Sequence, residues 1–131
     1  SCNASNNDVV FDVQRATNSP FLAAAFFPKY SRAARTLFVD DSAFAPTQDL
    51  IGILTHEFGH SVGFRHEHIW IGCTPEPTSE ARQVTAYDEM SVMHYPWCRD
   101  PPGGGESVSP LDMLGSVQLY GLSPALIASA G

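Results

Sequence analysis

The sequence predicts a single α+β domain built on a small, twisted mixed sheet, and two sets of segments carry this prediction. Three apolar stretches near the start of the chain are typical of β-strands, at residues 9–15, 21–27 and 36–40. One helix follows them, and a second closes the chain after a long irregular region. With 131 residues there is enough chain for one core, so we expect an upper part over residues 1–63 and a lower part over residues 64–131.

The three strand segments differ in the arrangement of their apolar residues. Val9 to Arg15 alternates in part, as a strand with one better-buried face does. Phe21 to Phe27 ends at Pro28, which suits an edge strand because proline has no N–H for a sheet neighbour. Thr36 to Asp40 is short and almost wholly apolar, so we expect it at the centre of the sheet with both faces covered.

The first helix has a start signal and an apolar face. Pro46 and Thr47 offer its start, with Asp49 in the first turn, where a carboxylate complements the helix dipole. Apolar residues recur at spacings of three and four and predict a core-facing stripe: Leu50, Ile51, Leu54, Phe58 and Val62.

The second helix is predicted by its capping residues. Ser109 is placed as the N-cap, Pro110 in the first turn and Asp112 at the capping-box position. Gly121 ends the helix. We therefore expect a C-terminal helix that packs its leucines on the core.

Three histidines within and just after the first helix fit the pattern HExxHxxGxxH. His56 and His60 are four residues apart, so both rings point to one side of a helix. His66 would lie on the wrong side of a continued helix, and Gly63 is placed where a left-handed conformation lets the chain turn. Neutral imidazole is the usual nitrogen ligand of zinc, and three such ligands leave one position open. The spacing predicts one catalytic Zn²⁺ held by His56, His60 and His66.

Glu57 directly follows the first predicted ligand and lies close enough to reach a water on the metal. A carboxylate there can take a proton from this water and pass it to a leaving amine. A chance HExxH on an amphipathic helix is the alternative, and the fixed offsets of Gly63 and His66 argue against it. We therefore interpret Glu57 as the general base and acid.

The composition excludes two classes of partner. The formal net charge is −7 and the seven Lys and Arg residues form no basic cluster, so we expect no nucleic acid. The longest apolar run, Phe21 to Phe27, is too short to cross a bilayer, so we expect no membrane partner. We expect a soluble monomer.

The cysteines and the first residue bear on localisation. Cys73 and Cys98 have Pro-rich, loop-like surroundings, which favours a disulfide and an oxidising, extracellular compartment; three reduced structural cysteines are the alternative. Cys2 is left over: it is free, pairs outside the chain, or occupies the zinc before activation. The chain starts at Ser1, so we expect a secreted form from which a leader or pro-segment has been removed.

The long histidine motif resembles that of the metzincin metallopeptidases, and His66-Glu67 resembles their astacin-like branch, where a Glu follows the third ligand. Residues 91–95, Ser-Val-Met-His-Tyr, are similar to the Met-turn of that branch. The resemblance implies that Met93 forms a hydrophobic base beneath the zinc. It also implies that Tyr95 is a fifth ligand or a stabiliser of the tetrahedral intermediate.

Further segments resemble the dual-action HEIGH metallopeptidases of bacteria and fungi, and they cover nearly the whole chain: Ala24 to Pro28, Gly63 to His68, Tyr95 to Cys98 and Leu119 to Gly121. Phe58 stands where that family has Ile. Metzincins usually carry a further strand and a long helix before the equivalent of residues 9–15, so this chain is either a minimal version or a fragment. The resemblance implies a zincin-like fold and a secreted zinc endopeptidase.

The resemblance also implies how a substrate is bound. Phe21 to Phe27 would border the cleft, and a protein or peptide substrate would join it as an extended strand; a plain buried strand is the alternative. Trp97, Arg99 and the loop behind Met93 would line the pocket for the residue after the scissile bond, and Arg99 would suit an acidic side chain. A zinc-bearing binding or adhesion module without turnover is the alternative function.

Overall fold

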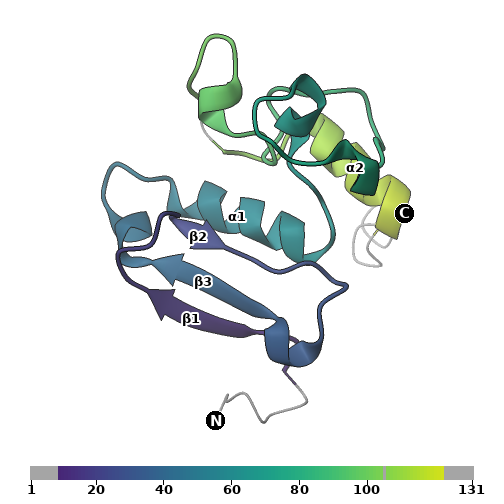
Figure 1. The fold of residues 1–131 in the computed structure, drawn as a ribbon. Helices are drawn as coiled ribbons and strands as arrows, with labels where there is room; N and C mark the ends of the chain where they lie inside the picture. The colour runs from purple at the N-terminus through teal and green to yellow at the C-terminus, as the bar shows by residue number, and fades with distance from the viewer. Residues whose placement is uncertain (1–8, 105, 123–131) are drawn as a thin grey trace, which may run out of the picture.

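The computed structural model describes residues 9–104 and 106–122, so Cys2 lies outside the described residues. Within them the chain forms a small mixed α+β domain, as predicted. Figure 1 shows α1 between the sheet and the segments that follow this helix. The strands and α-helices are β1 (Asp12–Ala16), β2 (Ala23–Ala24), β3 (Thr36–Asp40), α1 (Leu50–Ser61) and α2 (Pro110–Tyr120).

The sheet has the order β1-β3-β2, with β3 parallel to β1 and antiparallel to β2. The central position of Thr36–Asp40 and the edge position of the second strand are therefore confirmed. The predicted strand over residues 21–27 is too long, because only Ala23 and Ala24 pair with β3 as a strand. One further bond lies just before β2: the Asp40 N–H at the end of β3 donates to the Leu22 carbonyl at 2.8 Å.

The core lies between the sheet and α1. Leu37 and Val39 of β3 point toward the helix and are buried with Ala23, Ala43 and Ile53. Phe38 points to the opposite face and is 37% exposed. The expectation that β3 is covered on both faces is therefore wrong for the described residues: alternate side chains of this strand meet different surroundings.

The metal-motif helix begins later than predicted. Residues before it form a turn, in which the Gln48 N–H donates to the Ala45 carbonyl at 2.9 Å. Asp49 is the N-cap of α1 rather than a first-turn residue, and its side chain accepts from the Gly52 N–H at 3.0 Å. An aspartate in this place satisfies a free N–H of the first turn, so the helix starts at Leu50 and not at Pro46.

The buried face of α1 also differs from the predicted stripe. Leu50 and Leu54 pack on the core, but Ile51 is 80% exposed and Phe58 and Val62 are each 45% exposed. The fully buried positions are instead Gly52, Ile53, His56, Glu57 and His60. The helix is covered on two sides, by the sheet and by the following segments, so its polar motif residues are buried as well.

The helices among the described residues of 62–104 and 106–109 are short 3-10 helices, and α2 closes this half with the predicted capping box of Ser109 and Asp112. The predicted disulfide is confirmed: Cys73 and Cys98 are bonded, with their Cα atoms 5.9 Å apart. It joins two loops that both follow His56, His60 and His66 in the sequence. None of the described helices is long and apolar enough to cross a membrane.

Candidate metal centre

Three histidine Nε2 atoms converge at one place beside α1, as the spacing predicts. Nε2 of His66 lies 3.1 Å from Nε2 of His60 and 3.1 Å from Nε2 of His56. The helix supplies the first two rings, and the chain turns at Gly63, whose φ is +105°, to return with the third. A side chain at this φ would be strained, which is the reason for a glycine here. The three rings form a group that could hold a metal ion.

The second nitrogen of each ring fixes its tautomer. Each Nδ1 lies within hydrogen-bond distance of an oxygen: Val92 O for His56 at 2.7 Å, Phe64 O for His60 at 2.8 Å, and a Glu76 carboxylate oxygen for His66 at 2.6 Å. A carbonyl or carboxylate oxygen only accepts, so Nδ1 must carry the proton in every ring. In a neutral ring Nε2 is then a bare lone pair.

The three Nε2 lone pairs are the atoms that could bind a metal ion. Burial lowers the pKa of His60 to about 3 and that of His66 to about 3, with further lowering from the neighbouring rings. Burial also lowers the pKa of His56. Neutral rings cannot hydrogen-bond to each other through two unprotonated nitrogens, so the 3.1 Å approaches are repulsive unless a cation lies between them. The residues present therefore fit a bound metal ion.

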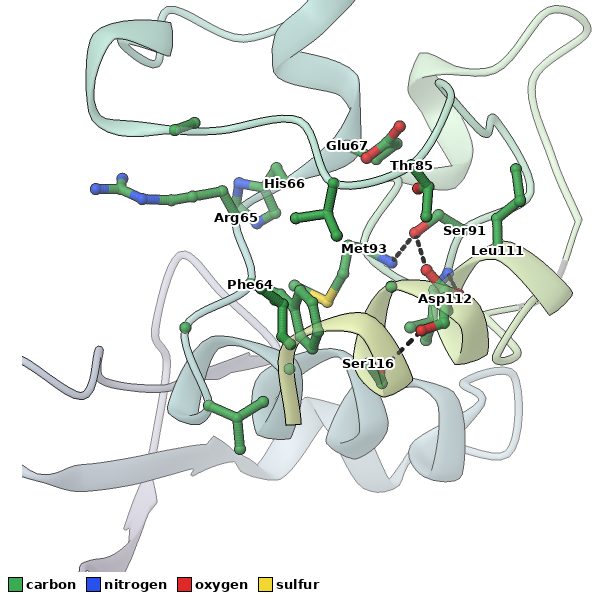
Figure 2. Close-up of a pocket in the computed structure, with 18 of the residues that line it drawn as sticks. Phe64, Arg65, His66, Glu67, Thr85, Ser91, Met93, Leu111, Asp112 and Ser116 are labelled. Carbon is green, nitrogen blue, oxygen red and sulfur yellow. Dashed lines mark hydrogen bonds between the residues drawn. The ribbon is translucent and has the colours of Figure 1, made fainter. Parts of the chain in front are cut away.

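Met93 lies against α1, and α2 holds the turn that carries Met93. The Met93 side chain is 4% exposed, and its sulfur is so close to Gly59 of α1 that a Cβ there would overlap it. Ser91 and the Val92 N–H donate to the Asp112 carboxylate at 2.6 and 2.8 Å. The Met93 N–H donates to the Ser91 hydroxyl at 3.0 Å, and Figure 2 shows this network.

Two cavities lie near the histidines, and they differ in chemistry. The larger, of about 460 Å³, is lined by α1, α2 and the turn of Met93, and Figure 2 shows it. The smaller, of about 310 Å³, contains His56, Glu57 and Tyr95. Its remaining lining comes from the chain that enters β2, from the first residue of that strand and from three other residues: Pro20, Phe21, Leu22, Ala23, Ile53, Trp97 and Glu106. We take the smaller cavity as the candidate cleft because it alone of the two holds the motif carboxylate.

Glu57 is a buried residue of α1, with 8% exposure, and its side chain lies toward the edge of the sheet. Burial raises the pKa of Glu57 to about 7, although a hydrogen bond from the Ala25 backbone acts in the opposite direction. Ala25 directly follows β2, so the sheet edge orients this carboxylate. A carboxyl group with a pKa near neutrality can both accept and donate a proton.

Tyr95 covers the histidines from the other side of the cleft. Its ring is stacked on His56 with centroids 5.5 Å apart and on Trp97 at 4.2 Å, and it lies 4.5 Å from His66. Burial, and then the charge of Glu57, raise the pKa of Tyr95 to about 12. The phenol therefore keeps its proton at neutral pH and is a hydrogen-bond donor.

Arg99 is not where the sequence places it. Its side chain is 6% exposed, and the guanidinium donates to the Gly103 carbonyl at 3.0 Å. It also lies 3.4 Å from the carbonyls of Ser91 and His94. Arg99 therefore holds the irregular loops together and does not line the cleft, whereas Trp97 does. Besides Glu57 and His56, the ionisable residue other than Tyr95 that lines the cleft is Glu106, which no sequence motif predicts.

A second group of possible ligands contains His66, His68 and Glu76. His68 is fully buried, and its Nδ1 accepts from the Tyr95 N–H at 3.1 Å. Its proton must then lie on Nε2, 3.8 Å from the Glu76 carboxylate. This distance is too long for a hydrogen bond, but a protonated Nε2 has no lone pair for a metal ion, so His68 does not complete a second metal site in this arrangement.

Comparisons of the chain with protein-family models, with curated proteins and with solved structures found no match. Function is therefore inferred from the residues and their geometry.

Proposed function

We propose that this chain is a secreted, zinc-dependent endopeptidase of the metzincin type, with His56, His60 and His66 as the zinc ligands. The observation that carries the proposal is the convergence of three unprotonated Nε2 atoms beside the cleft that His56 and Glu57 line. Three nitrogens bound tetrahedrally to one zinc ion at about 2.0–2.1 Å are roughly 3.3 Å apart, close to the observed 3.1 Å. Three neutral imidazoles are also the donor set of known catalytic zinc sites.

The side chains around this centre suit peptide hydrolysis. When bound, zinc supplies a Lewis acid that polarises the scissile carbonyl and lowers the pKa of water toward about 7. Glu57 takes a proton from the attacking water and returns it to the leaving amine, since its pKa of about 7 permits both transfers. Tyr95 donates its O–H to the negative charge that develops on the carbonyl oxygen.

The edge of the sheet supports binding of an extended peptide. Residues 20–23 line one wall of the cleft beside Glu57 and belong to the segment that enters the edge strand β2. A peptide lying along this segment would bring its backbone carbonyl toward the histidines. The uncovered side of β2 in the described part of the chain leaves room for such pairing.

The charges of the cleft favour a basic substrate side chain. Glu57 and Glu106 are its carboxylates, and the described lining residues include neither Lys nor Arg. Burial, and then the charge of Asp49, raise the pKa of Glu106, so a substrate cation near it would relieve an unfavourable charge. We therefore propose a preference for Lys or Arg near the scissile bond, in place of the acidic residue that Arg99 suggested.

Two further features support the family and the compartment. The resemblance implies a methionine beneath the zinc, and the buried Met93 side chain packed on Gly59 of α1, between His56 and His60, supports it. The Cys73–Cys98 disulfide supports an oxidising, extracellular compartment.

The test is proteolysis by three purified proteins: the wild-type chain, Glu57→Gln and the charge-matched control Glu89→Gln, an exposed residue away from the cleft. We expect wild type and control to cleave a casein-type substrate in a chelator-reversible manner. Glu57→Gln should keep one zinc per chain and lose about 10²–10⁴-fold of the rate, the contribution of general acid–base catalysis. Stoichiometric zinc without turnover in the wild-type chain would instead indicate a zinc-binding module.

A further inference from the structure

The Nδ1 atom of His66 has a different kind of hydrogen-bond partner from those of His56 and His60. His56 and His60 have backbone carbonyls as partners, whereas the partner of His66 is the Glu76 carboxylate at 2.6 Å. A short, charge-assisted bond of this kind is stronger than a neutral one. It also fixes the ring orientation and makes the far nitrogen a better electron-pair donor. His66 needs this support most, because it lies outside α1 and no helix holds its backbone.

Glu76 is itself held in place by a hydrogen bond from Thr74, and the buried His68 ring faces it. The Thr74 hydroxyl donates to the same carboxylate oxygen at 3.0 Å. The Nε2–H of the fully buried His68 faces this oxygen at 3.8 Å, while Tyr95 fixes the His68 ring through its N–H. The carboxylate is therefore aimed at His66 by its surroundings and is not a mobile surface group.

The disulfide connects this carboxylate to the opposite wall of the site. Cys73 lies three residues before Glu76, and Cys98 lies three residues after Tyr95. The segment between Gly72 and Thr78 contains no helix or strand, so nothing in its own backbone fixes the position of Glu76. One covalent bond thus ties the loop of Glu76 to the segment whose tyrosine ring lies on His66.

We propose that Glu76 is a positioning residue for His66, and that the Cys73–Cys98 disulfide strengthens metal binding by holding Glu76 in place. Glu76 keeps the proton of His66 on Nδ1, so that its Nε2 lone pair meets those of His56 and His60. This inference rests on the proposed metal centre, but it concerns how tightly the metal is held and not turnover.

The first test measures zinc affinity by competition with a chelator, using the folded full chain. Glu76→Gln keeps the shape of the side chain and removes its charge, and Glu89→Gln is the matched control. We expect Glu76→Gln to bind zinc about 10–100-fold more weakly and the control to match the wild type. Equal affinities for Glu76→Gln and wild type, or an equal loss in the control, would overturn the role of Glu76.

The disulfide is tested in a double-mutant cycle. The pair Cys73→Ser with Cys98→Ser should weaken zinc binding, and Glu76→Gln added to that pair should cost less affinity than in the wild-type chain. The same loss in both backgrounds would show that the disulfide does not act through Glu76.

A measurement on the wild-type chain alone tests the position of the His66 proton. Long-range ¹H–¹⁵N correlation spectra of the metal-free wild-type chain report which nitrogen of His66 carries the proton. We expect Nδ1–H, and Nε2–H would overturn the proposal even if every variant failed to fold. A wild-type chain that binds no zinc would overturn the metal centre itself, and the ring spectrum would then still decide the contact between Glu76 and His66.

Discussion

Replacement of Gly59 by alanine should destabilise the chain, although alanine is the better helix former. Gly59 lies within α1 between two of the predicted ligands, and alanine in a helix interior is favoured by about 0.8–1.0 kcal/mol. A Cβ at this position would overlap the Met93 sulfur and lie 3.2 Å from its methyl group. The sign of the change therefore depends on whether Met93 can move away.

The surroundings of Met93 oppose such a movement. Its side chain is buried, and its backbone is held through Ser91 and Asp112 to α2. Overpacking typically costs about 1–3 kcal/mol. Although Met93 borders the larger cavity, its held backbone keeps the sulfur close to Gly59, so we take the upper part of that range. After the gain in helix propensity is subtracted, we expect a net loss of about 1–2 kcal/mol, or about 4 °C in Tm for each kcal/mol.

Gly115 provides the matched control in the other helix. A Cβ there would lie 3.5 Å from the Thr85 methyl and 4.0 Å from Val84, which are ordinary contacts. Gly115→Ala should therefore stabilise the chain by up to about 1 kcal/mol. Urea denaturation of both variants gives the comparison, provided that the m-values agree. If Gly59→Ala is as stable as the wild type, or if adding Met93→Ala does not relieve its loss, the proposed packing of Met93 under α1 is wrong.

Two further predictions concern charges elsewhere in the domain. Glu106→Gln should reduce the preference for Lys or Arg near the scissile bond in a peptide-library digest, while Glu89→Gln leaves it unchanged; an unaltered preference would remove Glu106 from substrate selection. Asp40 accepts from the backbones of Ser42 and Ser19, which lowers its pKa from 3.8 to about 2. Its contribution to stability is present above about pH 4 and is lost as the pH falls toward 2. Asp40→Asn should therefore be less stable at neutral pH and flatten this acid-induced loss in urea titrations; coincident pH profiles would contradict the assignment.

The parts of the fold that the sequence predicts are those with a local physical cause. The central strand follows from an uninterrupted apolar run, and α2 follows from Ser109, Pro110 and Asp112, whose capping bonds lie within one turn. The convergence of the histidines follows in the same way, because helical spacing and one turn at Gly63 decide it. Each of these predictions needs only residues that are close together in the chain.

What the sequence does not reveal depends on contacts between distant residues. Glu76 meets His66 across ten positions of irregular chain, and no spacing rule selects it from the other carboxylates. The family resemblance implies that Arg99 lines the cleft, but loop carbonyls surround it instead. The buried face of α1 was misjudged for a related reason. A count of apolar residues places Phe58 and Val62 inward, whereas a second layer of chain covers the polar face of the helix.

The distribution of buried residues explains why so many contacts of the lower half end at the histidines. In the described part of the chain, six buried apolar side chains lie within or before α1, and the segments after α1 contribute three: Ile69, Val92 and Met93. A half with so little core needs other restraints to hold irregular backbone in one conformation.

The three Nδ1 contacts supply restraints of that kind. His56 holds the turn of Met93 through Val92, His60 holds the chain just past α1 through Phe64, and His66 holds the disulfide loop through Glu76. A metal ion joined to all three Nε2 atoms would lock these segments to one another, so its binding free energy would also be folding free energy. His56, His60 and His66 thus connect the ordered upper half to the loops that form the other wall of the cleft.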